Sequence, residues 1–119
     1  MNPTSLHEFK LPGFTLVPKE QLQESFSPDQ SAYYVLLRRH RAPDEPQECV
    51  VYVHYLDHFV ENCQRQIEEL WQKHRVWITH VAVKLGAPLR RTHDFAQAYT
   101  RALTVQRLRH ELHPRFRRL

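Results

Sequence analysis

A change of hydrophobic period within Glu48–Leu85 constrains the fold of this chain more than any other feature of its sequence. Apolar residues alternate along Val50–Leu56, as in a pleated strand that buries one face. Along Phe59–His74 the apolar positions instead fall in one arc of about 120° on a helical wheel. Alternation then returns along Arg75–Leu85. The stretch therefore predicts a strand, a helix and a second strand.

The predicted helix combines one apolar arc with a charged outer face. Asp57 precedes its first turn, where a carboxylate commonly accepts backbone N–H groups as the N-cap. We expect the arc to be buried, with about 1.5–3 kcal/mol of stabilisation from each of its large side chains, Ile67, Leu70 and Trp71. The outer face carries acids four residues before bases, which is the favourable order for ion pairs along a helix. These pairs are Glu61 with Arg65 and Glu69 with Lys73.

Further strands are predicted before this unit. The segment Ala32–Arg41 alternates, and the proline-containing loop 42–47 suits a hairpin that joins it antiparallel to the strand beginning near Cys49. Upstream, Phe14–Val17 is typical of a short edge strand and Lys19–Phe26 of a short helix. The chain therefore has enough strands for a small sheet.

The crossover helix limits how these strands can be arranged. A strand reached through a helix usually runs parallel to the strand before it, with a right-handed crossover. Two arrangements remain open: the two strands are neighbours, or the short strand at Phe14 lies between them. The second gives the β-α-β-β-α-β order of ferredoxin-like folds. The predicted class is α+β, with a small mixed β-sheet and a long C-terminal helix over Phe95–Leu112.

Size and composition bound the remaining possibilities. At 119 residues the chain is expected to form a single domain over 1–119, with a flexible arm over 1–12 and a basic tail over 113–119. Neither an apolar run of membrane-spanning length nor an export signal is found, so we expect no membrane partner and no secretion. The expected location is the cytoplasm, or the nucleus in a eukaryotic or viral host. Cys49 and Cys63 are expected to act as small, buried apolar side chains. We expect a reducing compartment for this chain.

The C-terminal helix carries more apolar surface than a single sheet requires. One stripe contains Phe95, Tyr99, Ala102 and Leu103, and a second is rotated from it by about 100°. A helix that packs on one sheet needs one stripe, so the sequence predicts either a bend near Leu103 or a face for another subunit. The predicted interface residues are those of the second stripe: Ala98, Val105, Leu108 and Leu112.

Positive charge suggests an alternative kind of partner. The formal net charge is +4, and arginine, which outnumbers lysine, binds phosphate and carboxylate through a planar fork. DNA or RNA would require several of these cations on one surface, with exposed Tyr33, Tyr34 or Trp77 as stacking platforms. The candidate residues lie at the hairpin end, before the last helix, and in that helix and the tail. They are Arg38, Arg39, Arg41, Arg90, Arg91, Arg107, Arg109, Arg115, Arg117 and Arg118.

A helix-turn-helix in the second half is a rival to the strand predicted there. Ala82 and Gly86 stand four residues apart, as an alanine and a turn glycine do in that motif, and the segment after Pro88 would be the recognition helix. The alternation of Val76–Leu85 favours a strand instead, and Thr92 occupies a position where the motif has an apolar residue.

A metal site is the third possibility, since imidazole and carboxylate together are a usual ligand set for zinc or iron. The weak candidates are His54, Asp57 and His58, which lie close together at the predicted strand-to-helix junction. The chain lacks a G-x-S-x-G motif, and two glycines leave little material for a loop that cradles phosphates. We therefore expect no cofactor and no enzymatic activity.

Together these patterns favour a small non-enzymatic accessory or regulatory protein. It is expected to act through protein contacts and to form homo-oligomers through the C-terminal helix. A basic module that binds DNA or RNA is the alternative, and a metal-dependent protein is the third hypothesis.

Overall fold

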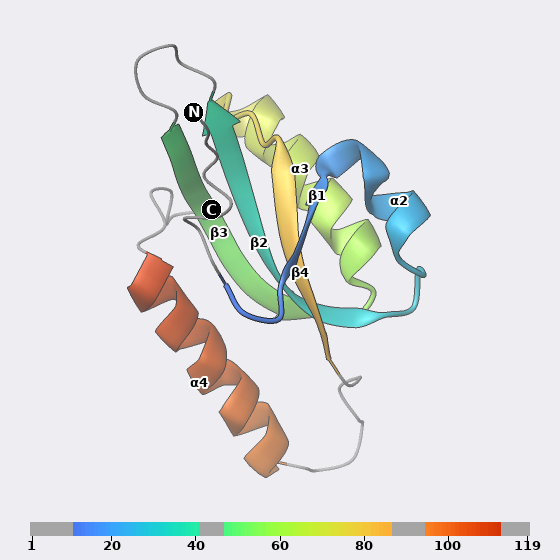
Figure 1. The fold of residues 1–119 in the computed structure, drawn as a ribbon. Coiled ribbons are helices and arrows are strands. Elements are labelled where there is room, and N and C mark those ends of the chain that lie inside the picture. The colour runs from blue at the N-terminus through green and yellow to red at the C-terminus, as the bar shows by residue number, and fades with distance from the viewer. Residues whose placement is uncertain (1–10, 41–46, 87–94, 113–119) are drawn as a thin grey trace.

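Four strands form one sheet in the computed structural model, which describes residues 11–40, 47–86 and 95–112. The sheet order is β1-β4-β2-β3, and every neighbouring pair is antiparallel. Helices cover both faces of the sheet, α2 and α3 on one side and α4 on the other (Figure 1). The strands are β1 (Thr15–Pro18), β2 (Ser31–His40), β3 (Gln47–Leu56) and β4 (His80–Gly86). The helices are the 3-10 turn η1 (Lys19–Gln21), α2 (Leu22–Ser25), α3 (Phe59–His74) and α4 (Phe95–Leu112).

The α+β class, the hairpin and the crossover helix are confirmed, but the strand arrangement differs from both of those predicted. The strands β3 and β4 run parallel to each other and are separated by β2, which pairs with both. The short strand β1 lies at the sheet edge, beyond β4. The hairpin occupies one edge of β2, so β4 pairs along its other edge. The sheet is consequently antiparallel rather than mixed, although the β-α-β-β-α-β order of elements is present.

The face covered by α3 holds the larger core. Phe59, Cys63 and Leu70 are at most 1% exposed and pack with residues of β2 and β4 such as Tyr34 and Val81. The hydroxyl of Tyr34 donates a 2.7 Å hydrogen bond to Oε1 of Gln66, which satisfies a polar group at this interface. Burial raises the pKa values of the Cys63 thiol and the Tyr34 hydroxyl. Both cysteines are free.

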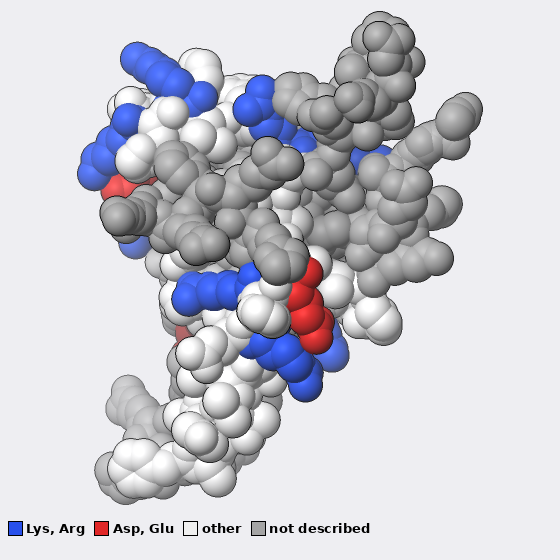
Figure 2. Space-filling model, turned by 90° about the vertical axis from the view of Figure 1, so that its left-hand side faces the viewer, with Lys and Arg blue, Asp and Glu red and all other residues white. Residues whose placement is uncertain are grey.

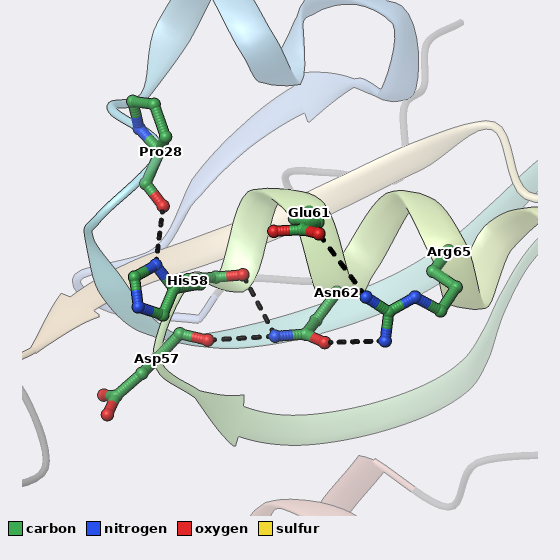
Figure 3. A network of polar contacts seen from close by, with 6 residues as sticks. All are labelled: Pro28, Asp57, His58, Glu61, Asn62 and Arg65. Carbon is green, nitrogen blue, oxygen red and sulfur yellow. Dashed lines mark hydrogen bonds and ion pairs between the residues drawn. The ribbon is translucent and has the colours of Figure 1, made fainter.

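The start of α3 differs from the predicted N-cap. His58 occupies the N-cap position in the left-handed region (φ 50°, ψ 47°), and no side chain caps the helix. The carboxylate of Asp57 points away from the helix (Figure 3) and accepts a 2.5 Å hydrogen bond from Oγ of Ser31. Instead, the amide of Asn62 donates to the carbonyl oxygens of Asp57 and His58, at 3.0 and 3.1 Å. Asp57 therefore joins the helix start to β2 rather than capping the helix.

The end of α3 corrects two further predictions. Arg75 adopts a left-handed conformation (φ 55°), and the N–H of Val76 donates to the carbonyl of Leu70, which ends the helix. The regular strand consequently begins at His80 rather than at Arg75. Trp71, predicted to be buried, lies in the last turn of α3 and is 39% exposed. Its ring packs edge-to-face on that of Trp77, at 5.2 Å between centroids. The two predicted ion pairs on the outer face are confirmed, at 3.5 Å for Glu61–Arg65 and 2.9 Å for Glu69–Lys73.

Candidate functional site on the C-terminal helix

An apolar stripe on α4 remains exposed to solvent. Phe95, Tyr99 and Leu103 are 77%, 66% and 45% exposed. They recur every four residues, so they lie along one side of the helix. Figure 2 shows that the lower part of the molecule, where α4 begins, is mostly uncharged among the described side chains. We call these three residues the exposed stripe.

The second predicted stripe faces the chain's own sheet. Val105 and Leu108 are each 7% exposed and pack with Val53, Tyr55 and other residues of the second core. Leu112 is partly buried against the same cluster, whereas Ala98 is exposed. Most of this stripe is therefore occupied within the chain, and the large apolar side chains that α4 leaves exposed are those of the exposed stripe.

A groove runs between α4 and the edge strand β3. Its volume is about 430 Å³. Ala98 and Ala102 stand one helical turn apart and leave space where longer side chains would fill it. The residues that line the groove are His54, Tyr55, Ala98, Arg101, Ala102, Val105, Gln106 and Arg109. The groove thus brings together one weak metal candidate, two predicted interface residues and one predicted nucleic-acid contact.

Two arginines of α4 lie over tyrosines of β3. The guanidinium of Arg101 is 4.9 Å from the ring centroid of Tyr55, and that of Arg109 is 5.3 Å from Tyr52. Nε of Arg109 also donates a 3.0 Å hydrogen bond to the carbonyl oxygen of Val53. Tyr52 packs with the core on the α3 side and Tyr55 with the core on the α4 side. Arg109 therefore reaches around the edge of the sheet, a placement that helical periodicity could not have indicated.

His54 lies at the same edge, partly buried beside aromatic rings. Its ring contacts Tyr52 edge-to-face, at 5.7 Å between centroids. Burial, followed by the positive charge of Arg109, lowers its pKa. Nδ1 of His54 is buried and has no hydrogen-bond partner among the described residues. The ring is therefore held in its neutral form near pH 7.

The three metal candidates do not converge. His54 lies against Tyr52, Asp57 accepts from Ser31, and Nδ1 of His58 lies 3.3 Å from the carbonyl oxygen of Pro28. Within the described parts of the chain, no group of three or more His, Cys, Asp and Glu side chains is arranged to hold a metal ion. The junction between β3 and α3 is instead held by hydrogen bonds (Figure 3).

Four of the arginines predicted to contact nucleic acid lie among the described residues, and they are at separate places on the molecule. Arg38 and Arg39 are half-buried at the end of β2, while Arg107 and Arg109 are exposed on α4. Among the described side chains, Figure 2 shows Lys and Arg at several separate places on this side of the molecule. The remaining candidates lie outside the described residues, as do the tail and most of the arm: Arg41, Arg90, Arg91, Arg115, Arg117 and Arg118.

The structure overturns one of the three predicted stacking platforms and the predicted helix-turn-helix. Tyr34 is fully buried, so it offers no stacking platform, and Tyr33 packs on Tyr55 at 4.5 Å between centroids. Trp77 is 46% exposed, with Nζ of Lys19 3.2 Å from its ring centroid. The helix-turn-helix is wrong, since Ala82 and Gly86 belong to the strand β4.

None of the described helices is long and apolar enough to cross a bilayer. Comparisons of the chain with models of protein families, with curated proteins and with solved structures found no match.

Proposed function

We propose that this chain is a small accessory or regulatory protein that acts through protein contacts and pairs with a second copy of itself through the exposed stripe of α4. The observation that carries the proposal is the exposure of Phe95, Tyr99 and Leu103 along one side of a single helix. Contiguous apolar surface of this kind commonly marks an interaction site. Aromatic side chains are also enriched among residues that dominate binding energy.

The position of α4 supports an interaction role. Its first turns lie beyond the end of the sheet (Figure 1), and residues 95–100 are all exposed. Helices gain most of their stability by packing an apolar face, and short isolated helices are marginal in water. A partner seated on the exposed stripe would supply packing to this half of the helix.

The charge distribution favours a second copy in an antiparallel arrangement. Residues 95–106 contain one charged side chain, Arg101, whereas Arg107 and Arg109 follow in the C-terminal part. Antiparallel pairing centred on Tyr99 brings the uncharged halves together and places the basic halves at opposite ends. A two-fold interface of this type uses the same patch on both copies, with Phe95 of each helix opposite Leu103 of the other.

Sedimentation velocity across a range of protein concentrations tests this proposal. The wild type is expected to shift from monomer to dimer, and Tyr99→Ser, at the centre of the stripe, is expected to remain monomeric at the same concentrations. Gln97→Ser is the control, because Gln97 is exposed in the same turn but on the other side of the helix. A monomeric wild type, or equal dimerisation of both variants, would contradict pairing through the stripe.

Nucleic-acid binding through the predicted arginines stays a prediction. Its signature would be an affinity for DNA or RNA whose logarithm falls linearly with the logarithm of salt concentration. An absence of binding at low salt would remove it.

A further inference from the structure

The polar groups that line the groove between α4 and β3 are suited to an anion. Arg101 and Arg109 contribute two positive charges, and Gln106, Tyr55 and His54 add side chains that can donate hydrogen bonds. Among the described residues that line the groove, none is an aspartate or a glutamate. A ligand that enters the groove therefore meets the positive charges of Arg101 and Arg109.

We propose that this groove binds a small ligand that carries oxyanion groups, either carboxylates or phosphates, through the guanidinium groups of Arg101 and Arg109. Its volume of about 430 Å³ falls within the range of about 300–1,000 Å³ typical of small-molecule sites. The two arginines are eight residues apart, or about 12 Å along the helix axis. This spacing suits a ligand with more than one anionic group.

The structure holds Arg109 in position for this role. Its Nε donates to the carbonyl of Val53 and its guanidinium lies over Tyr52, while its terminal N–H groups make no hydrogen bond to any described residue. Arg101 is half-buried over Tyr55. Side chains that are already ordered lose less conformational entropy on binding. Guanidinium groups also bind carboxylate and phosphate through paired hydrogen bonds.

The space in the groove depends on its alanines. Ala98 and Ala102 line one side of the groove, and a longer side chain at either position would project into it. Substitution there changes the space without removing either arginine. Volume and charge can therefore be tested separately, and neither test depends on the proposed pairing through the exposed stripe.

Two probes distinguish the sources of the oxyanion. Inorganic pyrophosphate represents phosphates and citrate represents carboxylates, and each is titrated into the purified full-length protein by calorimetry at low salt. Saturable binding of at least one probe is expected, and the tighter probe identifies the source. If neither probe binds at about 10 mM, which corresponds to less than about 3 kcal/mol of binding free energy, the proposal is overturned.

Matched variants locate the site. A hydrogen bond to a charged group contributes about 1.5–3 kcal/mol, so Arg101→Gln and Arg109→Gln are each expected to weaken binding by about 10- to 100-fold. Arg107→Gln removes the same charge from the same helix outside the groove and is expected to change affinity less than about threefold. Equal losses in all three variants would show general attraction of anions to a basic helix and would overturn the proposal.

Ala98→Leu provides the test that is independent of charge. It keeps both arginines and places a longer side chain in the groove, so weaker probe binding is expected together with an unchanged thermal unfolding midpoint. Binding as tight as in the wild type would place the anion elsewhere and overturn the proposal. Tyr99→Ser, which changes the exposed stripe, is expected to bind the probe normally.

Discussion

The two long helices, α3 and α4, cover opposite faces of one sheet and differ in how their apolar residues are used. On α3 the buried residues Phe59, Val60, Cys63 and Leu70 follow one arc, and acid–base pairs occupy the outer face. On α4 two residues are buried, while large apolar side chains face solvent. The comparison shows that α3 is built for the fold, whereas α4 carries apolar surface that the sheet does not use. Both proposals concern α4 for this reason.

The largest expected effect tests the structural role of α3. Leu70 is 1% exposed within the larger core, and Leu70→Ala removes buried methyl groups and leaves a cavity. We expect the free energy of unfolding to fall by about 2–5 kcal/mol, measured by urea denaturation. A loss below about 1 kcal/mol would show that this core is less tightly packed than the structure indicates.

The same substitution on α4 should have a smaller effect. Leu108 is 7% exposed in the smaller core, so Leu108→Ala is expected to cost about 2 kcal/mol, at the lower end of the range for such changes. Hydrogen exchange should show local loosening of α4 while amides of α3 stay protected. A cost equal to that of Leu70→Ala would remove the contrast between the helices.

The end of α3 offers a stabilising change. Arg75 holds a left-handed conformation at φ 55°, which costs a residue with a Cβ atom more than it costs glycine. Arg75→Gly is therefore expected to raise the free energy of unfolding by about 0.5–1 kcal/mol in urea denaturation. Lys73→Gly is the control, since Lys73 lies inside the helix, where glycine costs about 1 kcal/mol. Destabilisation by both variants would contradict the role given to the conformation of Arg75.

The smallest effect concerns pH and two histidines of the sheet, His54 of β3 and His80 of β4. Burial lowers the folded-state pKa values of His54 and His80, with further contributions from Arg109 and Arg39 respectively. Below the ordinary histidine pKa of about 6.5 the unfolded chain binds more protons, so the free energy of unfolding should fall as pH falls from 7 to 5.

Replacement of the two histidines tests this cause. His54→Gln and His80→Gln should each flatten part of the decline, and the double variant should flatten more of it. Urea denaturation across this interval provides the measurement. The lowered pKa of Glu69, held down by its hydrogen bond to Lys73, acts at lower pH, below its ordinary value of 4.5. If the free energy of unfolding of the double variant falls as much between pH 7 and 5 as that of the wild type, groups other than these histidines cause the decline.

Much of the fold was readable from local patterns. The bounds of α3 and α4, the β2–β3 hairpin and the outer ion pairs of α3 follow from periodicity and short-range spacing. Asp57 was misassigned because its partner, Ser31, is 26 residues away in sequence. Trp71 was misassigned because it lies in the last turn of α3, where it packs on Trp77 just beyond the helix end. The groove could not be predicted, since Arg109 meets Val53 and Tyr52 from a helix more than 50 residues away in sequence.

By itself the sequence determined that α4 has two apolar stripes, because helical periodicity is a local property of the chain. The tertiary structure decided which stripe packs inside: Val105 and Leu108 lie on the sheet, while Phe95, Tyr99 and Leu103 face solvent. Likewise, alternation fixed the existence of β4, and pairing with the open edge of β2 fixed its place. Periodicity states which residues share a face, whereas the identity of the surface opposite that face depends on contacts between segments distant in sequence.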